Sequence, residues 1–256
     1  TCAIIFTSGT TGNPKGALHT YASMKAGAVT LSYLSHVLSS DNIACYLPPA
    51  WITEQLISVG CHLLSGGIVN YGEDAETLLA DMREIGPDIV YGNARQWEAQ
   101  ASRIQARIQG ADAIKRFAYR KMITTGYRMA DTRAQRRKPG FGLKTAYAIA
   151  NLLLLRPLRD SLGLPGTKSC FTSGSILSPE AFRFYLAIGI PLRHIYVTTE
   201  GGILAGTKAG DTRFDTVGEI MPGSEVGITE DSEIVYRQPG LFNGYIGDPD
   251  ATQNVL

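Results

Sequence analysis

The chain carries, at residues 7–16, the stretch Thr7-Ser8-Gly9-Thr10-Thr11-Gly12-Asn13-Pro14-Lys15-Gly16. It follows an apolar run, Ala3-Ile4-Ile5-Phe6, which predicts a buried strand. The glycines let the backbone approach a ligand and present its N–H groups, while the hydroxyls add donors and Lys15 adds a compact positive charge. This chemistry suits a polyphosphate. The spacing differs from a Walker A loop, because Gly9 and Gly12 are three residues apart and Gly16 follows Lys15.

Two later regions accompany this loop. One is Ile195-Tyr196-Val197-Thr198-Thr199-Glu200, and the other comprises Ser232-Glu233-Ile234-Val235-Tyr236-Arg237, Gly240-Leu241-Phe242-Asn243-Gly244-Tyr245 and Pro249-Asp250-Ala251-Thr252. Together with the loop they resemble the motifs of the adenylate-forming superfamily, which includes acyl-CoA synthetases, luciferases and the adenylation domains of peptide synthetases. The resemblance covers essentially the whole chain.

The resemblance implies a set of nucleotide-binding residues. Adenylation gathers negative charge on phosphate oxygens, so it needs oriented donors, a cation and Mg²⁺. Thr199 is expected to bond the α-phosphate of ATP and Glu200 to hold Mg²⁺, which makes these two and Lys15 the candidate catalytic residues. The segment from Thr172 to Glu180 is similar to the family's adenine-binding segment. The expected ATP-binding residues are Thr7, Ser8, Gly9, Thr10, Thr11, Gly12, Lys15, Gly16, Gly174, Ser175, Tyr196 and Thr199.

Two other segments resemble the acyl-binding side of long-chain fatty acid–CoA ligases. Leu47-Pro48-Pro49-Ala50-Trp51-Ile52-Thr53-Glu54-Gln55 has Trp51 where histidine is commoner, and Asn93-Ala94-Arg95-Gln96-Trp97-Glu98 is similar to a stretch typical of that subfamily. Trp51, Trp97 and Val197 are therefore the candidate substrate-binding residues, although Trp97 is equally compatible with a core position. Val197 occupies the glycine of the family's Tyr-Gly-x-Thr-Glu motif, and a β-branched side chain there is expected to crowd the site.

The function implied by this resemblance is ATP-dependent activation of a long-chain fatty acid to acyl-AMP, followed by transfer to coenzyme A. Two alternatives stay open: a fatty acyl-AMP or aryl-acid ligase, and a non-catalytic nucleotide- or lipid-binding paralogue, to which the Val197 departure points. The expected partners are small molecules, namely the fatty acid, ATP with Mg²⁺, and coenzyme A, in the cytoplasm. The sequence leaves the chain length of the acid and the oligomeric state open.

Composition excludes several other classes. The formal net charge of +1 gives no global signal for nucleic acid, and no apolar run reaches the roughly 18 residues that a membrane-spanning helix needs. The four cysteines and four histidines are scattered without metal-site spacing, which predicts reduced thiols rather than disulfides or metal ligands.

Apolar and turn residues alternate along the chain in a way that predicts an α/β fold with mainly parallel strands covered by helices. After about Gly201 the helix signals disappear, so we expect residues 1–200 to form the α/β core and residues 201–256 to begin a small β subdomain. The expected helices span residues 17–38, 51–64, 75–85, 95–109 and 179–188, and the expected strands span residues 43–47, 68–71, 89–91, 168–173 and 191–197.

An insertion at residues 115–155 departs from this alternation. Residues 115–144 hold many Lys and Arg residues with Asp131 as the one acid, and the apolar stretch from Ala146 to Leu155 follows. The pattern predicts either a solvated helical insertion beside a core helix or a patch that contacts membranes peripherally.

The resemblance also implies a fragment of the large N-terminal domain of such an enzyme. Relatives carry a longer portion before the phosphate loop, and a ribose-binding motif, a hinge and a small C-terminal domain after the point that corresponds to Leu256. On this reading the chain alone is expected to be inactive.

Overall fold

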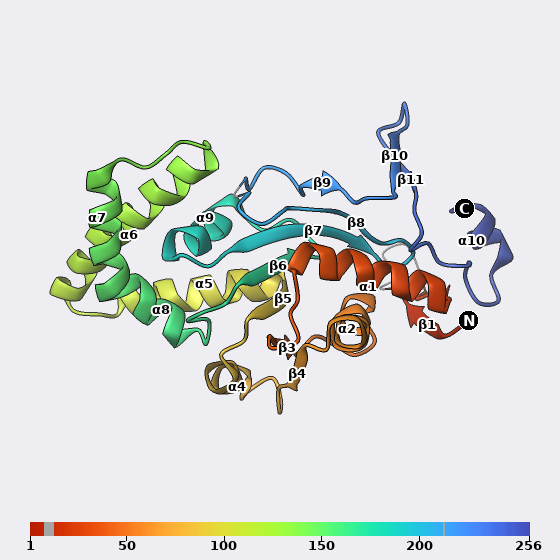
Figure 1. Cartoon of the computed structure of the whole chain (residues 1–256), viewed down its shortest axis with the longest axis horizontal. Coiled ribbons are helices and arrows are strands. Elements are labelled where there is room, and N and C mark those ends of the chain that lie inside the picture. Colours follow the sequence, from red (N-terminus) through yellow and green to blue (C-terminus); the bar gives the residue numbers. More distant parts are fainter. Residues whose placement is uncertain (8–12, 212) are drawn as a thin grey trace.

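The computed structural model describes residues 1–7, 13–211 and 213–256 of the chain. A seven-stranded sheet in the order β4-β3-β5-β6-β7-β8-β9 lies at its centre (Figure 1). Its strands are β3 (Asn42–Cys45), β4 (Ile68–Tyr71), β5 (Ile89–Asn93), β6 (Ser169–Ser173), β7 (Leu192–Thr198), β8 (Gly202–Gly206) and β9 (Glu219–Ile220). The first five of these strands run parallel, whereas β8 pairs antiparallel with β7 and β9 pairs antiparallel with β8. The predicted α/β fold with a mainly parallel sheet is confirmed.

Helices cover both faces of this sheet, because alternate residues of each inner strand point to opposite faces and are apolar on both. On one face Tyr91 and Phe171 pack with Leu31, and on the other Val90 and Cys170 belong to the core around Trp97. The first layer contains α1 (Tyr21–Ser35), α2 (Ile52–Gln55), the π-helical η1 (Leu56–Cys61) and α3 (His62–Ser65). The second layer contains α4 (Leu78–Ile85), α5 (Ala94–Gln109) and α9 (Pro179–Ile188).

The basic insertion is a helical projection at one end of the long axis, opposite the end where both termini lie (Figure 1). It comprises α6 (Ala113–Ala134), α7 (Phe141–Ala150), η2 (Asn151–Leu155) and α8 (Arg156–Ser161). Arg183 of α9 donates to both carboxylate oxygens of Asp131 of α6, at 2.6 and 2.5 Å. The insertion is therefore fixed to the core through α9. Within the part of the chain that the structure describes, no helix is both long enough and apolar enough to cross a membrane.

Gly126 sets how closely α6 approaches α9. A Cβ at this position would lie 2.5 Å from the carbonyl oxygen of Ala187, whereas a Cβ at Gly142, at the start of α7, would meet nothing within 4 Å. We expect Gly126→Ala to destabilise the full-length protein by about 1–3 kcal/mol, because the helices must move apart. Gly142→Ala is the matched control and should gain up to about 1 kcal/mol from helix propensity. Urea unfolding of the two variants checks this, and equal stabilisation by both would refute the close packing.

The segment next to the phosphate loop differs from its prediction. Gly16–His19 forms strand β2, antiparallel to β1 (Ala3–Phe6), so the helix expected from Ala17 begins only at Tyr21. Thr20 caps that helix by accepting a hydrogen bond from the Ser23 amide at 3.1 Å, and the Ser23 hydroxyl caps in return. Strand β1 is also less buried than expected, since Ile5 is buried while Ile4 and Phe6 are exposed.

The sheet continues across the boundary expected at residue 200. Strand β8 pairs with β7 from Ile195 to Thr198, and β9 pairs with β8, so residues 202–220 extend the central sheet instead of starting a subdomain. A separate two-stranded sheet follows, formed by β10 (Glu225–Ile228) and β11 (Ile234–Arg237). The short helix α10 (Pro249–Gln253), which the sequence analysis did not expect, comes near the end of the chain.

Candidate functional site

The candidate adenine-binding residues lie at the carboxyl edge of the parallel strands, where α/β sheets bind ligands. Strands β6 and β7 are neighbours with Thr172 opposite His194, so the residues that follow both strands lie at one edge. Gly174 comes directly after β6, with a φ of 82° and an exposed position, and Ser175 beside it is also exposed. Tyr196 is half-buried near the end of β7. The structure thus brings Gly174, Ser175 and Tyr196 to the same edge.

The base of the candidate phosphate loop is closed by hydrogen bonds between its two ends. The Thr7 amide donates to the Lys15 carbonyl at 2.9 Å, and the Lys15 amide donates to the Thr7 hydroxyl at 3.2 Å. Gly16 then enters β2, where its carbonyl accepts from the Ile246 amide at 2.9 Å. The predicted phosphate ligands Ser8, Gly9, Thr10, Thr11 and Gly12 lie outside the described residues.

Tyr245 connects this loop to Glu200. Its hydroxyl donates to Oε1 of Glu200 at 2.6 Å, and the Lys15 ammonium lies 5.2 Å from the centre of its ring. The Phe242 amide donates to the Glu200 backbone carbonyl at 2.8 Å, so the segment that contains Phe242 and Tyr245 contacts Glu200 at two points. Burial, followed by the hydrogen bond to Glu200 and its charge, raises the pKa of Tyr245. Tyr245 therefore remains a neutral donor that orients the Glu200 carboxylate.

His19 contacts Thr199, the residue directly before Glu200. Its Nε2 lies 2.9 Å from the carbonyl oxygen of Thr199, which can only accept, so Nε2 carries the proton. Nδ1 lies 3.3 Å from the Ser23 hydroxyl. Burial lowers the pKa of His19, while the bond to Thr199 and the charge of Glu200 oppose that effect. The geometry thus describes a buried, neutral imidazole that holds the backbone of the Thr199-Glu200 turn.

A buried, neutral His19 should make the stability of the folded protein depend on pH. Because the folded pKa lies below the ordinary value of 6.5, the unfolded chain takes up a proton that folded His19 does not, so stability is lost as pH falls below 6.5. We expect His19→Gln, which retains a donor for Thr199, to reduce the slope of unfolding free energy against pH by up to about 1.4 kcal/mol per pH unit. Urea unfolding between pH 7 and 5 measures both slopes. His194, whose pKa is also lowered by burial, is present in both proteins and cancels; identical slopes would contradict a neutral His19.

The turn after β7 is fixed on its other side by the β11 region. The Thr198 hydroxyl accepts from the Gly201 amide at 2.9 Å and lies 2.9 Å from the Tyr236 hydroxyl. The Gln238 side-chain amide donates to the Gly201 carbonyl. A Cβ at Gly201 would lie 2.4 Å from the Tyr236 hydroxyl, so a larger residue here would displace the Tyr236 side chain from its contact with Thr198. Thr199 and Glu200 are therefore held in a rigid turn.

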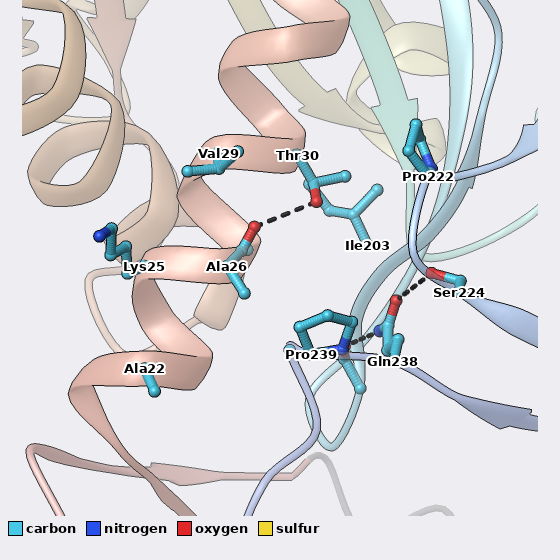
Figure 2. A pocket seen from close by; sticks show the side chains of 13 residues that line it. Ala22, Lys25, Ala26, Val29, Thr30, Ile203, Pro222, Ser224, Gln238 and Pro239 are labelled. Carbon is cyan, nitrogen blue, oxygen red and sulfur yellow. Dashed lines mark hydrogen bonds between the residues drawn. The ribbon is translucent and has the colours of Figure 1, made fainter.

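A groove of about 370 Å³ opens beside this turn, between α1 and β8 (Figure 2). Ala22 and Ala26 of α1 form one wall, and Ile203 and Pro239 form the opposite side. Gly201, which directly follows Glu200, also lines it. The groove is lined mainly by apolar and small residues and adjoins the candidate catalytic turn.

The three candidate acyl-binding residues do not share one environment. Trp51 precedes α2 and is 44% exposed, whereas Trp97 is only 2% exposed. The Trp97 indole N–H donates to the Phe171 carbonyl at 3.1 Å, and its ring meets Tyr185 edge-on at 5.0 Å. Trp97 is therefore a core residue, which corrects its placement among the substrate-binding residues. Val197 is half-buried against the core under α1, at a bulge between Tyr196 and Val197.

Sequence reasoning missed His19 and Tyr245. It gave His19 no role beyond its unsuitable spacing for a metal, and it quoted Tyr245 within a motif without a role. Both act through contacts with residues far along the chain, at positions 199 and 200. Among the described residues, no cluster of three or more His, Cys, Asp or Glu side chains forms a metal site from protein ligands alone.

The chain is similar in sequence to long-chain-fatty-acid–CoA ligases. The chain is 30% identical over 271 residues to the long-chain-fatty-acid–CoA ligase ACSBG2 of Rattus norvegicus, covering 100% of this chain and 40% of the relative. It is 26% identical over 253 residues to the long-chain-fatty-acid–CoA ligase FadD15 of Mycobacterium tuberculosis, covering 97% of this chain and 41% of the relative. The chain thus spans less than half the length of these relatives.

Solved structures share the fold at low identity. The N-terminal domain of FACL13 from Mycobacterium tuberculosis, in an inhibitor-bound crystal structure, aligns with a TM-score of 0.65 at 17% identity, covering 99% of this chain and 54% of that one. ATP-bound MatB from Rhodopseudomonas palustris aligns with a TM-score of 0.65 at 17% identity, covering 98% of this chain and 42% of that one. Residues 1–246 match the AMP-binding enzyme family. The chain belongs to the AMP-binding enzyme family.

Proposed function

We propose that the protein activates a long-chain fatty acid with ATP to form acyl-AMP and then transfers the acyl group to coenzyme A. The observation that carries this proposal is the link from Lys15 through Tyr245 to Glu200, because it connects the end of the candidate phosphate loop with the Thr199-Glu200 turn. The names of relatives that cover the whole chain, long-chain-fatty-acid–CoA ligases, support the substrate class.

In this proposal each group at the sheet edge has one task. Lys15 and the loop from Thr7 to Gly16 hold the phosphates of ATP, and Thr199 bonds the α-phosphate. Gly174 and Ser175 leave the backbone open to adenine, because a Cβ at Gly174 would meet nothing within 4 Å, and Tyr196 stacks on the ring. The positioned donors stabilise the charge that develops as the carboxylate attacks the α-phosphorus.

Glu200 is the proposed Mg²⁺ ligand. Mg²⁺ in nucleotide enzymes is usually held by one or two carboxylates together with substrate phosphates, which fits a site with a single oriented carboxylate. Tyr245 donates to Oε1 at 2.6 Å and so directs the carboxylate. The metal, when bound, neutralises phosphate charge. The chain's own contribution is to fix Glu200 through Tyr245 and through the Phe242 amide.

Trp51 and Val197 are proposed to contact the acyl chain. Trp51 is exposed at the start of α2, and Val197 lies at the bulge directly before the catalytic turn. In place of the glycine typical of the family motif, the Val197 side chain occupies space near the acyl phosphate, so it should restrict the acids accepted.

A panel of acids tests the substrate class. The full-length protein, with ATP, Mg²⁺ and coenzyme A, is assayed for thioester formation with palmitate, octanoate, acetate and benzoate. We expect palmitate to give the highest kcat/KM. Preference for benzoate would indicate an aryl-acid ligase, adenylate without thioester would indicate a fatty acyl-AMP ligase, and no adenylate with any acid would indicate a non-catalytic paralogue.

A further inference from the structure

The outer face of α7 and η2 combines exposed apolar side chains with unbalanced positive charge. Phe141, Leu152 and Leu153 are 86%, 68% and 60% exposed, and Ile149 is 56% exposed. Residues 132–159 contain seven Lys or Arg and no Asp or Glu. We call this surface the α7 face, defined by Phe141, Lys144, Ile149, Leu152, Leu153 and Arg156.

The opposite side of the same helices is already used for packing. Leu155 and Ala150 are buried in the core that includes α9. The Arg159 guanidinium donates to the Ile188 carbonyl at the end of α9, and Arg133 lies 5.6 Å from the centre of the Tyr147 ring. The α7 face is therefore presented outward by a segment that the core holds in place.

Basic residues extend the charge beyond the apolar centre. Arg137 and Lys138 lie in the exposed connection between α6 and α7, directly before Phe141. Arg136 in the same connection lies 3.9 Å from Asp211, so part of its charge is balanced. At the start of α6, Phe117 is 65% exposed with the Lys121 ammonium 5.8 Å from its ring centre. Phe117 and Lys121 thus give α6 a second exposed apolar side chain next to a cation.

We propose that the α7 face docks on the surface of an anionic lipid bilayer. Apolar side chains of an interfacial helix enter the headgroup and acyl boundary while flanking Lys and Arg contact lipid phosphates. A second copy of the chain would oppose two faces of the same charge, which disfavours self-association. Nucleic acid would leave the exposed leucines without a partner. Docking needs neither ATP nor a carboxylic acid, so it stands apart from the ligase activity; it would also place the enzyme where long-chain acids partition.

Vesicle flotation of the full-length protein tests this proposal. The probes are vesicles of phosphatidylcholine alone and of phosphatidylcholine with 30 mol% phosphatidylglycerol, at low and high salt. We expect binding to the anionic vesicles at low salt and its loss at high salt. Arg137→Glu with Lys138→Glu should weaken binding at least about 30-fold, because each Lys or Arg near such a surface contributes about fivefold.

Two further variants separate insertion from charge attraction. Leu152→Ser with Leu153→Ser should weaken binding to anionic vesicles at least tenfold, as expected for losing two buried side chains. Leu63→Ser, at a leucine of α3 that is 76% exposed, is the matched control and should bind like the unaltered protein. The side chains changed are exposed, and unaltered thermal unfolding confirms that the variants fold.

Three results would overturn the proposal: equal binding to neutral and anionic vesicles, no binding at low salt, or unaltered binding by both double variants. Sedimentation of the free protein adds a fourth. If the unaltered protein self-associates and Leu152→Ser with Leu153→Ser makes it monomeric, the α7 face is an interface between copies instead.

Discussion

Glu200→Gln should reduce fatty-acid-dependent ATP–pyrophosphate exchange by at least about 100-fold, the scale of losing one group that stabilises a charged transition state. The glutamine amide has the size of the glutamate side chain, and its oxygen can still accept the hydrogen bond that the Tyr245 hydroxyl donates at 2.6 Å to Glu200. What it removes is the negative charge that a hard cation requires. The loss should be partly recovered at high Mg²⁺ concentration.

Glu233→Gln is the matched control for this substitution. Glu233 is exposed in the turn between β10 and β11 and has no role in the proposal, so the Glu233→Gln variant should exchange pyrophosphate like the unaltered protein. Tyr245→Phe gives an intermediate test, because it removes only the donor that orients Glu200. Near-normal exchange by Glu200→Gln at low Mg²⁺ would rule out the metal role.

Lys15→Ala should lower kcat/KM for ATP by about 10- to 150-fold, the usual range for losing a charge-assisted contact. The Lys15 backbone closes the candidate phosphate loop through two hydrogen bonds with Thr7, and an alanine at position 15 keeps both. The substitution therefore removes the ammonium group without opening the loop. Lys208→Ala, at an exposed ion pair with Glu219, is the control. Values for ATP within twofold of the unaltered protein would place the Lys15 charge away from the phosphates.

Local signals predicted much of the sheet and its helices. The helix expected at residues 179–188 has the observed bounds, because Ser178 caps it, Pro179 begins it and Gly189 ends it with a φ of 87°. Strands were also expected at residues 89–91 and 168–173, close to the observed β5 and β6. In contrast, Ala17 and Leu18 fit a helical pattern as well as a strand, and only pairing with β1 decides between them. Pairing also decides the position of β8: because its partner is β7, it belongs to the central sheet and not to a separate subdomain.

In the candidate site, too, local sequence signals did not predict contacts between residues far apart along the chain. The motifs predicted that Gly174, Tyr196 and Glu200 would share a site, and the register of β6 with β7 brings them to one edge. No local pattern distinguished Trp97, which is buried, from Trp51, which is exposed. Tyr245 and His19 acquire their roles only from contacts across the fold, with Glu200 and Thr199. Spacing along the chain contains no information about such contacts.

The most direct test of acyl-adenylate formation is to follow one oxygen atom from the fatty acid to AMP. If the carboxylate attacks the α-phosphorus of ATP at the Lys15–Glu200 site, thiolysis of the acyl-AMP must leave one carboxylate oxygen on AMP. The full-length protein is incubated with palmitate carrying ¹⁸O in both carboxylate oxygens, together with ATP, Mg²⁺ and coenzyme A, and the nucleotide product is weighed by mass spectrometry. We expect AMP with a single ¹⁸O atom; unlabelled AMP, or ADP and phosphate as products, would contradict adenylate formation.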